Sequence, residues 1–172
     1  MNEVDLGHYT LEEVRRFWDH MVARNPLPPS DPGALHVFFR IGQQWFALDS
    51  SVCKGVEPYR KPSPLPVMPQ HIMGVAAVRG RPVAVTNLGI FFGIRNVEEG
   101  GHLLIIGSDG EETALKTDWV DRVGHIREWE TEAVPEKFRG MRTGLASRIT
   151  YKKNSMVLIL DPGRCMKAAE SA

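Results

Sequence analysis

Cys53 and His71 are the first pair of side chains with the chemistry for catalysis, as a thiol nucleophile and its general base. Cys53 lies in a strand-like run, whereas His71 follows a proline-rich stretch, and the spacing places no Asp or Asn to orient the imidazole. His102 and His125 lie in separate strand-like runs without a Cys or carboxylate at ligand spacing, which leaves a zinc site without support. The sequence therefore predicts no catalytic residue, no metal site and no cofactor.

The sequence also lacks the patterns expected for phosphate binding and for nucleic-acid binding. Gly107-Ser-Asp-Gly110 predicts a hairpin turn and not a phosphate loop, because no helix beginning Lys-Ser or Lys-Thr follows it. Twenty-one basic residues balance twenty-one acidic ones, so no overall field draws polyanions to the surface. We expect no nucleic-acid partner.

The most distinctive stretch is His71 to Val85, in which two apolar runs flank the turn Arg79-Gly80-Arg81. Such a corner, without a nucleophile or metal cluster nearby, indicates a surface that holds partners. Two interpretations of Arg79 are open: it contacts a partner, or it closes the turn by bonding to carbonyls of its own domain. Arg81 is expected to be solvated, because Pro82 follows it.

Composition indicates a folded protein that stays in the cytoplasm. The 172 residues are 42% hydrophobic and 24% charged, enough for one compact domain or two small intertwined ones. The charge-free stretch from Val83 to Ile94 is too short to span or insert into a membrane, and the acidic N-terminus does not resemble a signal peptide. Cys53 and Cys165 are expected to be buried thiols in a reducing compartment.

Residues 1–33 are predicted to form a capped amphipathic helix followed by a proline-rich spacer, ahead of a domain over residues 34–172. Thr10 and Glu13 make a capping box, and apolar residues recur at helical spacing. The apolar face either packs on the main domain or docks a partner or a second copy, and the residues proposed for that docking are Phe17, Trp18 and Met21.

After Ala34 the hydrophobic pattern alternates, which predicts a mainly β domain. A short helical piece is predicted near 88–92, an extended connector over 57–69 and a short C-terminal helix around Cys165. Strand-like runs occupy residues 35–41, 44–48, 52–56, 83–88, 102–107, 113–117, 119–126 and 156–160.

The β region contains a faint internal repeat. Phe39-Arg-Ile-Gly42 leads to Ala47-Leu48 and Val56, and Leu104-Ile-Ile-Gly107 leads to Ala114-Leu115 and Val123 in the same order. Two hairpins, each followed by a further strand, predict two small five-stranded barrels with a groove between them.

An ordered set of motifs over about 35–167 resembles the CheW coupling domain family. The set comprises Phe39-Arg-Ile-Gly-Gln-Gln-Trp-Phe-Ala-Leu-Asp49, Leu65-Pro66, Ile72-Met-Gly74-Val75, Val78-Arg79-Gly80, the strand from Val83 to Leu88, Phe92-Gly93 and Leu158-Ile-Leu-Asp161-Pro. The resemblance implies two similar five-stranded SH3-like β-barrels. It also implies a non-catalytic adaptor that couples the cytoplasmic tip of a chemoreceptor to the regulatory domain of a CheA-type histidine kinase.

The resemblance also assigns roles to residues. It implies a receptor-binding site at Arg79, Gly74, Gly80 and Val78, and a kinase or partner surface at Val52, Lys54 and Val56. The chain departs from the family pattern at Gly55, where the family commonly has Glu, at Ala77 in place of Asn, and at Asn87 in place of Asp. These departures and the N-terminal helix favour a divergent member, similar in layout to those of pilus-type chemosensory systems. The alternative is a small β-barrel sensor that binds a metabolite in the inter-barrel groove.

Overall fold

The structure, a computed structural model, describes residues 32–94, 99–108, 110–136 and 144–170. The predicted N-terminal helix, with Phe17, Trp18 and Met21, lies outside the described residues. None of the helices in the described ranges is long and apolar enough to cross a membrane.

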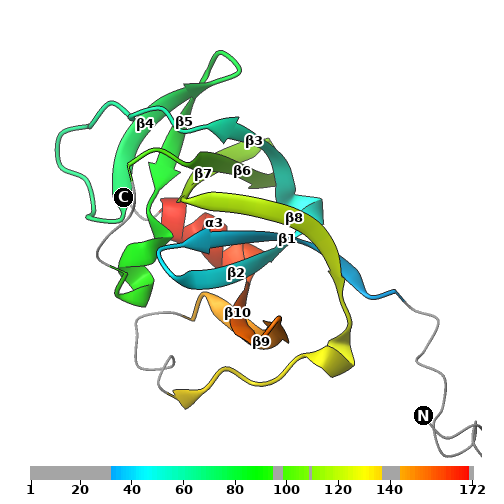
Figure 1. The fold of residues 1–172 in the computed structure, drawn as a ribbon. Helices are drawn as coiled ribbons and strands as arrows, with labels where there is room; N and C mark the ends of the chain where they lie inside the picture. The colour runs from blue at the N-terminus through cyan, green and yellow to red at the C-terminus, as the bar shows by residue number, and fades with distance from the viewer. Residues whose placement is uncertain (1–31, 95–98, 109, 137–143, 171–172) are drawn as a thin grey trace, which may run out of the picture. The chain divides into compact units, whose positions relative to one another are not determined.

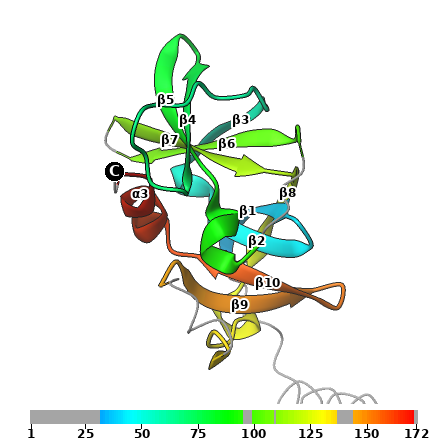
Figure 2. The same cartoon turned by 90° about the vertical axis from the view of Figure 1, so that its left-hand side faces the viewer.

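Ten strands form two five-stranded sheets with the same arrangement (Figures 1 and 2). Sheet 1 has the order β8 (Trp119–Ile126), β1 (Ala34–Ile41), β2 (Gln44–Asp49), β10 (Ser155–Leu160), β9 (Ala146–Lys152). Sheet 2 has the order β3 (Cys53–Pro58), β6 (His102–Ser108), β7 (Glu111–Thr117), β5 (Arg81–Thr86), β4 (Ile72–Val78). In each sheet one parallel pair, β10 with β2 or β5 with β7, joins antiparallel strands. The prediction of a mainly β fold with two similar five-stranded units is confirmed.

The chain interlocks the two sheets, because it leaves sheet 1 after β2 and returns to it at β8. Short 3-10 helices η1 (Ser50–Val52), η2 (Leu88–Phe92) and η3 (Glu128–Glu130) link strands, and helix α3 (Pro162–Glu170) follows β10. The helical piece predicted near 88–92 is therefore present. It is capped by Asn87, whose Oδ1 accepts a hydrogen bond from the backbone N–H of Gly89 at 2.9 Å.

The predicted repeat is present in the strand registers, with one correction. Val123 of β8 pairs with Val37, and Val56 of β3 pairs with Leu104 at the corresponding place. The match of Gly42 with Gly107 was wrong: Gly42 begins the β1–β2 turn, whereas Gly107 lies within β6, opposite Glu112. The turn predicted over residues 107–110 is correspondingly shorter, because β6 continues to Ser108 and β7 starts at Glu111.

The largest hydrophobic cluster lies between the sheets and takes side chains from both. Phe39 and Phe46 of sheet 1 stack there at 5.6 Å between ring centroids, and Leu104 and Leu115 come from sheet 2. Each sheet also has a smaller cluster on its other face, as alternation along a strand requires.

A buried ion pair lies where the chain leaves sheet 2 for sheet 1. The Nζ atom of Lys116 lies 3.1 Å from Oδ1 of Asp118, and the two side chains are 1% and 0% exposed. Oδ2 of Asp118 accepts a hydrogen bond from the backbone N–H of Gly42 at 2.6 Å. The pair thus connects β7 to the β1–β2 turn of the other sheet.

Candidate partner-binding site

The Arg79-Gly80 corner is a two-residue turn between β4 and β5. Both residues have positive φ, 49° for Arg79 and 77° for Gly80, which is the pattern of a type I′ hairpin turn. Glycine adopts this conformation freely, whereas arginine is held in it at a cost. The turn presents the Arg79 side chain, which is 57% exposed.

Arg79 reaches from one edge of sheet 2 to the other. Its Nη2 donates a hydrogen bond to the carbonyl oxygen of Lys54 at 3.2 Å, and its Nε lies 3.6 Å from Oε1 of Glu57. Lys54 and Glu57 both lie on β3. Because β3 and β4 are the two edge strands of sheet 2, these contacts span the open side of a curled sheet. Arg79 thus bonds to its own barrel, as the turn-closing interpretation expects, while more than half of its side chain stays accessible.

Gly55 makes room for this guanidinium. A Cβ atom on Gly55 would collide with Nη2 of Arg79. The position at which the family commonly has Glu is therefore occupied by the Arg79 side chain, and the acidic group beside Arg79 is instead Glu57, two residues further along β3. The chain therefore has no carboxylate at position 55, and the carboxylate beside Arg79 belongs to Glu57.

A pocket of about 330 Å³ opens beside the turn. Glu57 and Arg79 line it together with Arg60 from the connector, so its rim carries both charges. Val78 also lines it but is only 4% exposed and belongs to the sheet 2 core, so it supplies the floor of this surface.

The structure brings part of the predicted kinase or partner surface next to Arg79. Lys54 is exposed on β3 and Val56 is 43% exposed, whereas Val52 is partly buried against the central cluster. The strand begins at Cys53, not Val52, because Ser50 to Val52 form η1.

Gly74 does not lie in the turn. It is buried in β4, where its φ of 139° and lack of a side chain let the carbonyl of Ser63 approach. Two hydrogen bonds between Val75 and Ser63, each 2.9 Å, attach the proline-rich connector to β4 at this point. Gly74 therefore shapes the backbone behind the corner.

Cys53 and His71, the pair considered for catalysis, each have surroundings that do not suit that role. Burial, and secondarily the charge of Asp49, raise the pKa of the Cys53 thiol to about 11, so it is not a thiolate at neutral pH. Nε2 of His71 donates to the carbonyl of Ala168 at 2.8 Å, and its ring packs against Phe91. Cys53 and Cys165 are free thiols. Within the described ranges, no three His, Cys, Asp or Glu side chains are grouped to hold a metal ion.

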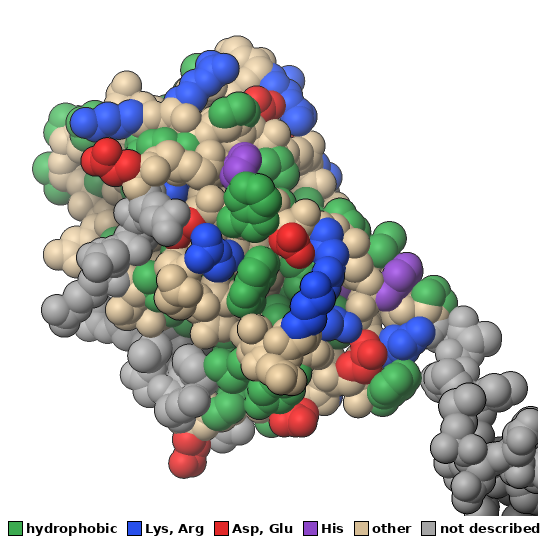
Figure 3. Space-filling view, viewed as in Figure 1, with side chains coloured by type: hydrophobic (Ala, Val, Ile, Leu, Met, Phe, Trp, Pro, Cys, Tyr) green, Lys and Arg blue, Asp and Glu red, His purple; other side chains and the backbone are tan. Residues whose placement is uncertain are grey.

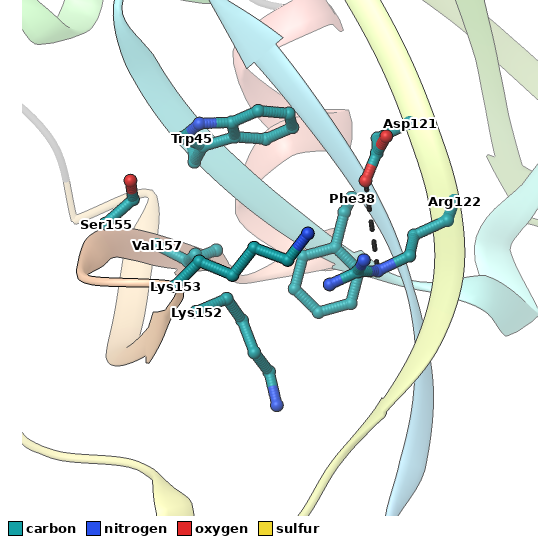
Figure 4. A pocket seen from close by; sticks show the side chains of 8 residues that line it. All are labelled: Phe38, Trp45, Asp121, Arg122, Lys152, Lys153, Ser155 and Val157. Atoms are coloured by element: carbon teal, nitrogen blue, oxygen red, sulfur yellow. Dashed lines mark ion pairs between the residues drawn. The ribbon is translucent and has the colours of Figure 1, made fainter.

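A second surface, missed from the sequence, lies beside the β9–β10 turn of sheet 1. A pocket of about 270 Å³ opens there, shown in Figure 4. Its basic lining side chains are Arg122, Lys152 and Lys153. The internal repeat does not reveal it, because the turn Lys153-Asn154 corresponds to Arg79-Gly80 at a different sequence separation from that of Ala47-Leu48 and Ala114-Leu115.

The fold and these surfaces define a two-barrel binding domain. Residues 36–170 match the CheW-like domain family, and the chain belongs to that family. It is similar to "Chemotaxis protein CheW" from Treponema pallidum (strain Nichols), with 20% identity over 153 residues, 86% of this chain and 90% of the relative. The crystal structure of the scaffolding protein TtCheW from Thermoanaerobacter tengcongensis has the same fold. It matches with a TM-score of 0.65 and 24% identity, covering 75% of this chain and 89% of that one.

Proposed function

We propose that this chain is a non-catalytic adaptor that couples a chemoreceptor to a CheA-type histidine kinase in a bacterial chemosensory pathway. The observation that carries the proposal is the match to the CheW-like family over residues 36–170, which spans almost the whole β domain. The metabolite-sensor alternative gains no support. It needs a groove between the two barrels, and the facing sides of the two sheets are filled by the central hydrophobic cluster.

The β4–β5 corner is the proposed receptor site. Arg79 supplies directional hydrogen-bond donors beyond the two contacts it makes within its barrel, and Gly80 lets the turn adopt its positive φ. Gly74 and Val78 support the corner from behind.

The outer face of β3 is the proposed kinase surface. Lys54 and Val56 supply its exposed charge and apolar area, and Val52 borders it. Because Arg79 bonds to the carbonyl of Lys54, the receptor and kinase contacts are mechanically adjacent. The adaptor acts by binding alone: it transmits a signal when the assembled complex has two arrangements of different free energy and the receptor favours one of them.

Size-exclusion chromatography with a purified CheA-type regulatory domain tests the class of function. A co-eluting complex supports the adaptor. Failure to bind that domain and a receptor tip, together with a small molecule that raises the melting temperature, would overturn it in favour of the sensor.

Receptor-controlled kinase activity tests the site, using Arg79→Gly and the matched variant Arg81→Gln. Both remove one exposed positive charge from the same turn region. We expect Arg79→Gly to weaken receptor-dependent control about tenfold or more, as loss of a central arginine contact does, while kinase-domain binding stays near wild type. Arg81→Gln should behave as wild type. Equal effects of the two variants would show that only net charge matters and would remove Arg79 from the site.

We propose chemotaxis or pilus-based motility as the pathway output, and the departures from the family pattern together with the sequence prediction of an N-terminal helix favour the pilus-type layout. Deletion of the gene in its own bacterium should then abolish surface motility and leave swimming intact. Loss of swimming alone would assign the chain to a flagellar system.

A further inference from the structure

The β9–β10 turn repeats the geometry of the β4–β5 turn in the other sheet. Lys153 and Asn154 have φ of 48° and 63°, beside 49° and 77° for Arg79 and Gly80. Each turn joins the two strands at the same end of its sheet, β10 and β9 in one, β5 and β4 in the other. Lys153 is thus the counterpart of Arg79.

The strand that faces each turn carries its charged residues at different positions. In sheet 2, Glu57 of β3 pairs with Leu103 and provides the carboxylate beside Arg79. At the corresponding place in sheet 1, Gly124 of β8 pairs with His36, so this place provides no carboxylate for Lys153.

A second exchange adds a positive charge to the sheet 1 corner. Gly55 pairs with Ile105, and at the corresponding place Arg122 pairs with Phe38. At these two positions sheet 2 has Gly55 and Glu57, whereas sheet 1 has Arg122 and Gly124. The preceding position changes the other way, from Lys54 in β3 to Asp121 in β8, so the sheet 1 corner has its acid beside Arg122 and none opposite Lys153. The guanidinium of Arg122 lies over the Phe38 ring, 5.6 Å from its centroid.

The pocket at this corner combines positive charge with an aromatic wall. Figure 4 shows Lys153 and Arg122 extending from opposite sides toward Phe38. In Figure 3, blue side chains lie over β8 beside hydrophobic ones. The complete lining consists of Phe38, Trp45, Asp121, Arg122, Lys152, Lys153, Ser155 and Val157.

Three bases against one acid leave this pocket with excess positive charge. Asp121 lies 3.8 Å from Arg122, its chain neighbour, and Lys152 lies 3.8 Å from Glu130. Lys153 has no ion pair among the residues that the structure describes.

We propose that the pocket beside Lys153 binds a carboxylate side chain of a partner protein, carried next to an apolar side chain. The carboxylate takes the place that Glu57 has in the other corner, and the apolar group packs on Phe38 and Trp45. A carboxylate fits better than a phosphate dianion, because Asp121 lines the same pocket and repels a second negative charge. The site lies in sheet 1, apart from the Arg79 corner, and does not depend on the identity of the receptor or kinase.

Titration of the ¹⁵N-labelled full chain with the dipeptides acetyl-Glu-Leu-amide and acetyl-Gln-Leu-amide tests the proposal by NMR. Both peptides have the same shape, and only the first carries the charge. We expect saturable shifts of the Trp45 indole N–H and of the Lys153 and Ser155 amides, with the Glu peptide bound at least fivefold more tightly. Equal shifts with both peptides, or none that saturate, would overturn the proposal. Inorganic phosphate that shifts the same resonances and binds more tightly than the Glu peptide would show a general anion site. That result would also overturn the proposal.

Three variants locate the binding. Lys153→Asn removes the ammonium and keeps a residue that tolerates positive φ, so the turn is preserved. Arg122→Gln removes the second cation. We expect each to weaken the Glu peptide about three- to fivefold, the range for one exposed ion pair, with little effect on the Gln peptide. Lys61→Gln, an exposed cation of the connector, is the matched control and should change nothing. If the spectrum of Lys153→Asn is well dispersed, the variant is folded. Unchanged binding of the Glu peptide by this folded variant would refute the assignment, even if Arg122→Gln is unfolded.

Discussion

Replacing Arg79 by glycine separates the two interpretations of this residue. If Arg79 exists to close the barrel, its removal must destabilise the fold. If it serves a partner, the fold should tolerate its loss. Glycine is the better substitute than alanine, because Arg79 has a φ of 49° and glycine adopts this value without a Cβ clash.

The opposing contributions to stability nearly cancel. The ion pair to Glu57 joins side chains that are 57% and 34% exposed, and such pairs contribute about 0–1 kcal/mol. The exposed hydrogen bond to Lys54 contributes about 0.5–1.5 kcal/mol. Relief of the left-handed backbone returns about 1–2 kcal/mol, from which the greater freedom of glycine in the unfolded chain removes about 0.5–1 kcal/mol. We therefore expect Arg79→Gly to lie within about 1 kcal/mol of the parent.

Urea and thermal unfolding followed by circular dichroism measure this change. For a domain of this size, about 1 kcal/mol corresponds to about 2–4 °C in melting temperature. Arg79→Ala loses the same contacts without the backbone relief and should be less stable than Arg79→Gly. Lys153→Gly, at the equivalent turn with φ of 48°, should be at least as stable as the parent. A loss above about 2 kcal/mol for Arg79→Gly alone, beyond the ordinary range for surface contacts, would refute the reasoning and establish Arg79 as a barrel-closing residue.

Two further predictions concern the interior. Asp118→Ala removes the buried carboxylate that lies 3.1 Å from the Lys116 ammonium, and should cost about 3–5 kcal/mol in urea unfolding. Adding Lys116→Met should recover most of that loss, and a double variant as unstable as the single one would contradict this. Burial, followed by the charge of Asp161, raises the pKa of the Cys165 thiol to about 12. The buried thiol stays protonated where the unfolded thiol, with a pKa near 9, has already ionised. The contribution of Cys165 to the free energy of unfolding is therefore fully present below pH 9 and is lost as the pH rises toward 12. The free energy of unfolding should then fall with pH less steeply in Cys165→Ala, by up to about 1.4 kcal/mol per pH unit; equal slopes from pH 9 to 10.5 would contradict it.

Strands with clear alternation were predictable from the sequence. In β1, Val37, Phe39 and Ile41 face the central cluster as expected, because alternate residues of a strand point to one side. Strand β9 was not predicted. Only Ile149 and Thr150 are buried in it, so its side chains show no period of two. Because β9 is an edge strand and the rest of the domain covers only a short part of it, its sequence shows little hydrophobic alternation.

The internal repeat was visible where equivalent residues are alike and hidden where they differ. Ala47-Leu48 and Ala114-Leu115 revealed it, because both pairs are fully buried at the same place in β2 and β7. The equivalence of Arg79 and Lys153 was not visible, since it becomes apparent only once β4–β5 and β9–β10 are seen at the same place in two sheets.

By itself the sequence determined the β class of this protein and the turn that carries Arg79, because these depend on residues close together in the chain. It also determined the family resemblance, because that rests on the order of short motifs along the chain. The tertiary structure decided what surrounds that turn. Glu57 and Gly55 meet Arg79 because sheet 2 curls until its two edge strands face each other. It also decided that the β9–β10 corner holds three cations from two distant segments. Local patterns record which side of a strand is buried, whereas the meeting of two strand edges depends on the twist and pairing of the whole sheet.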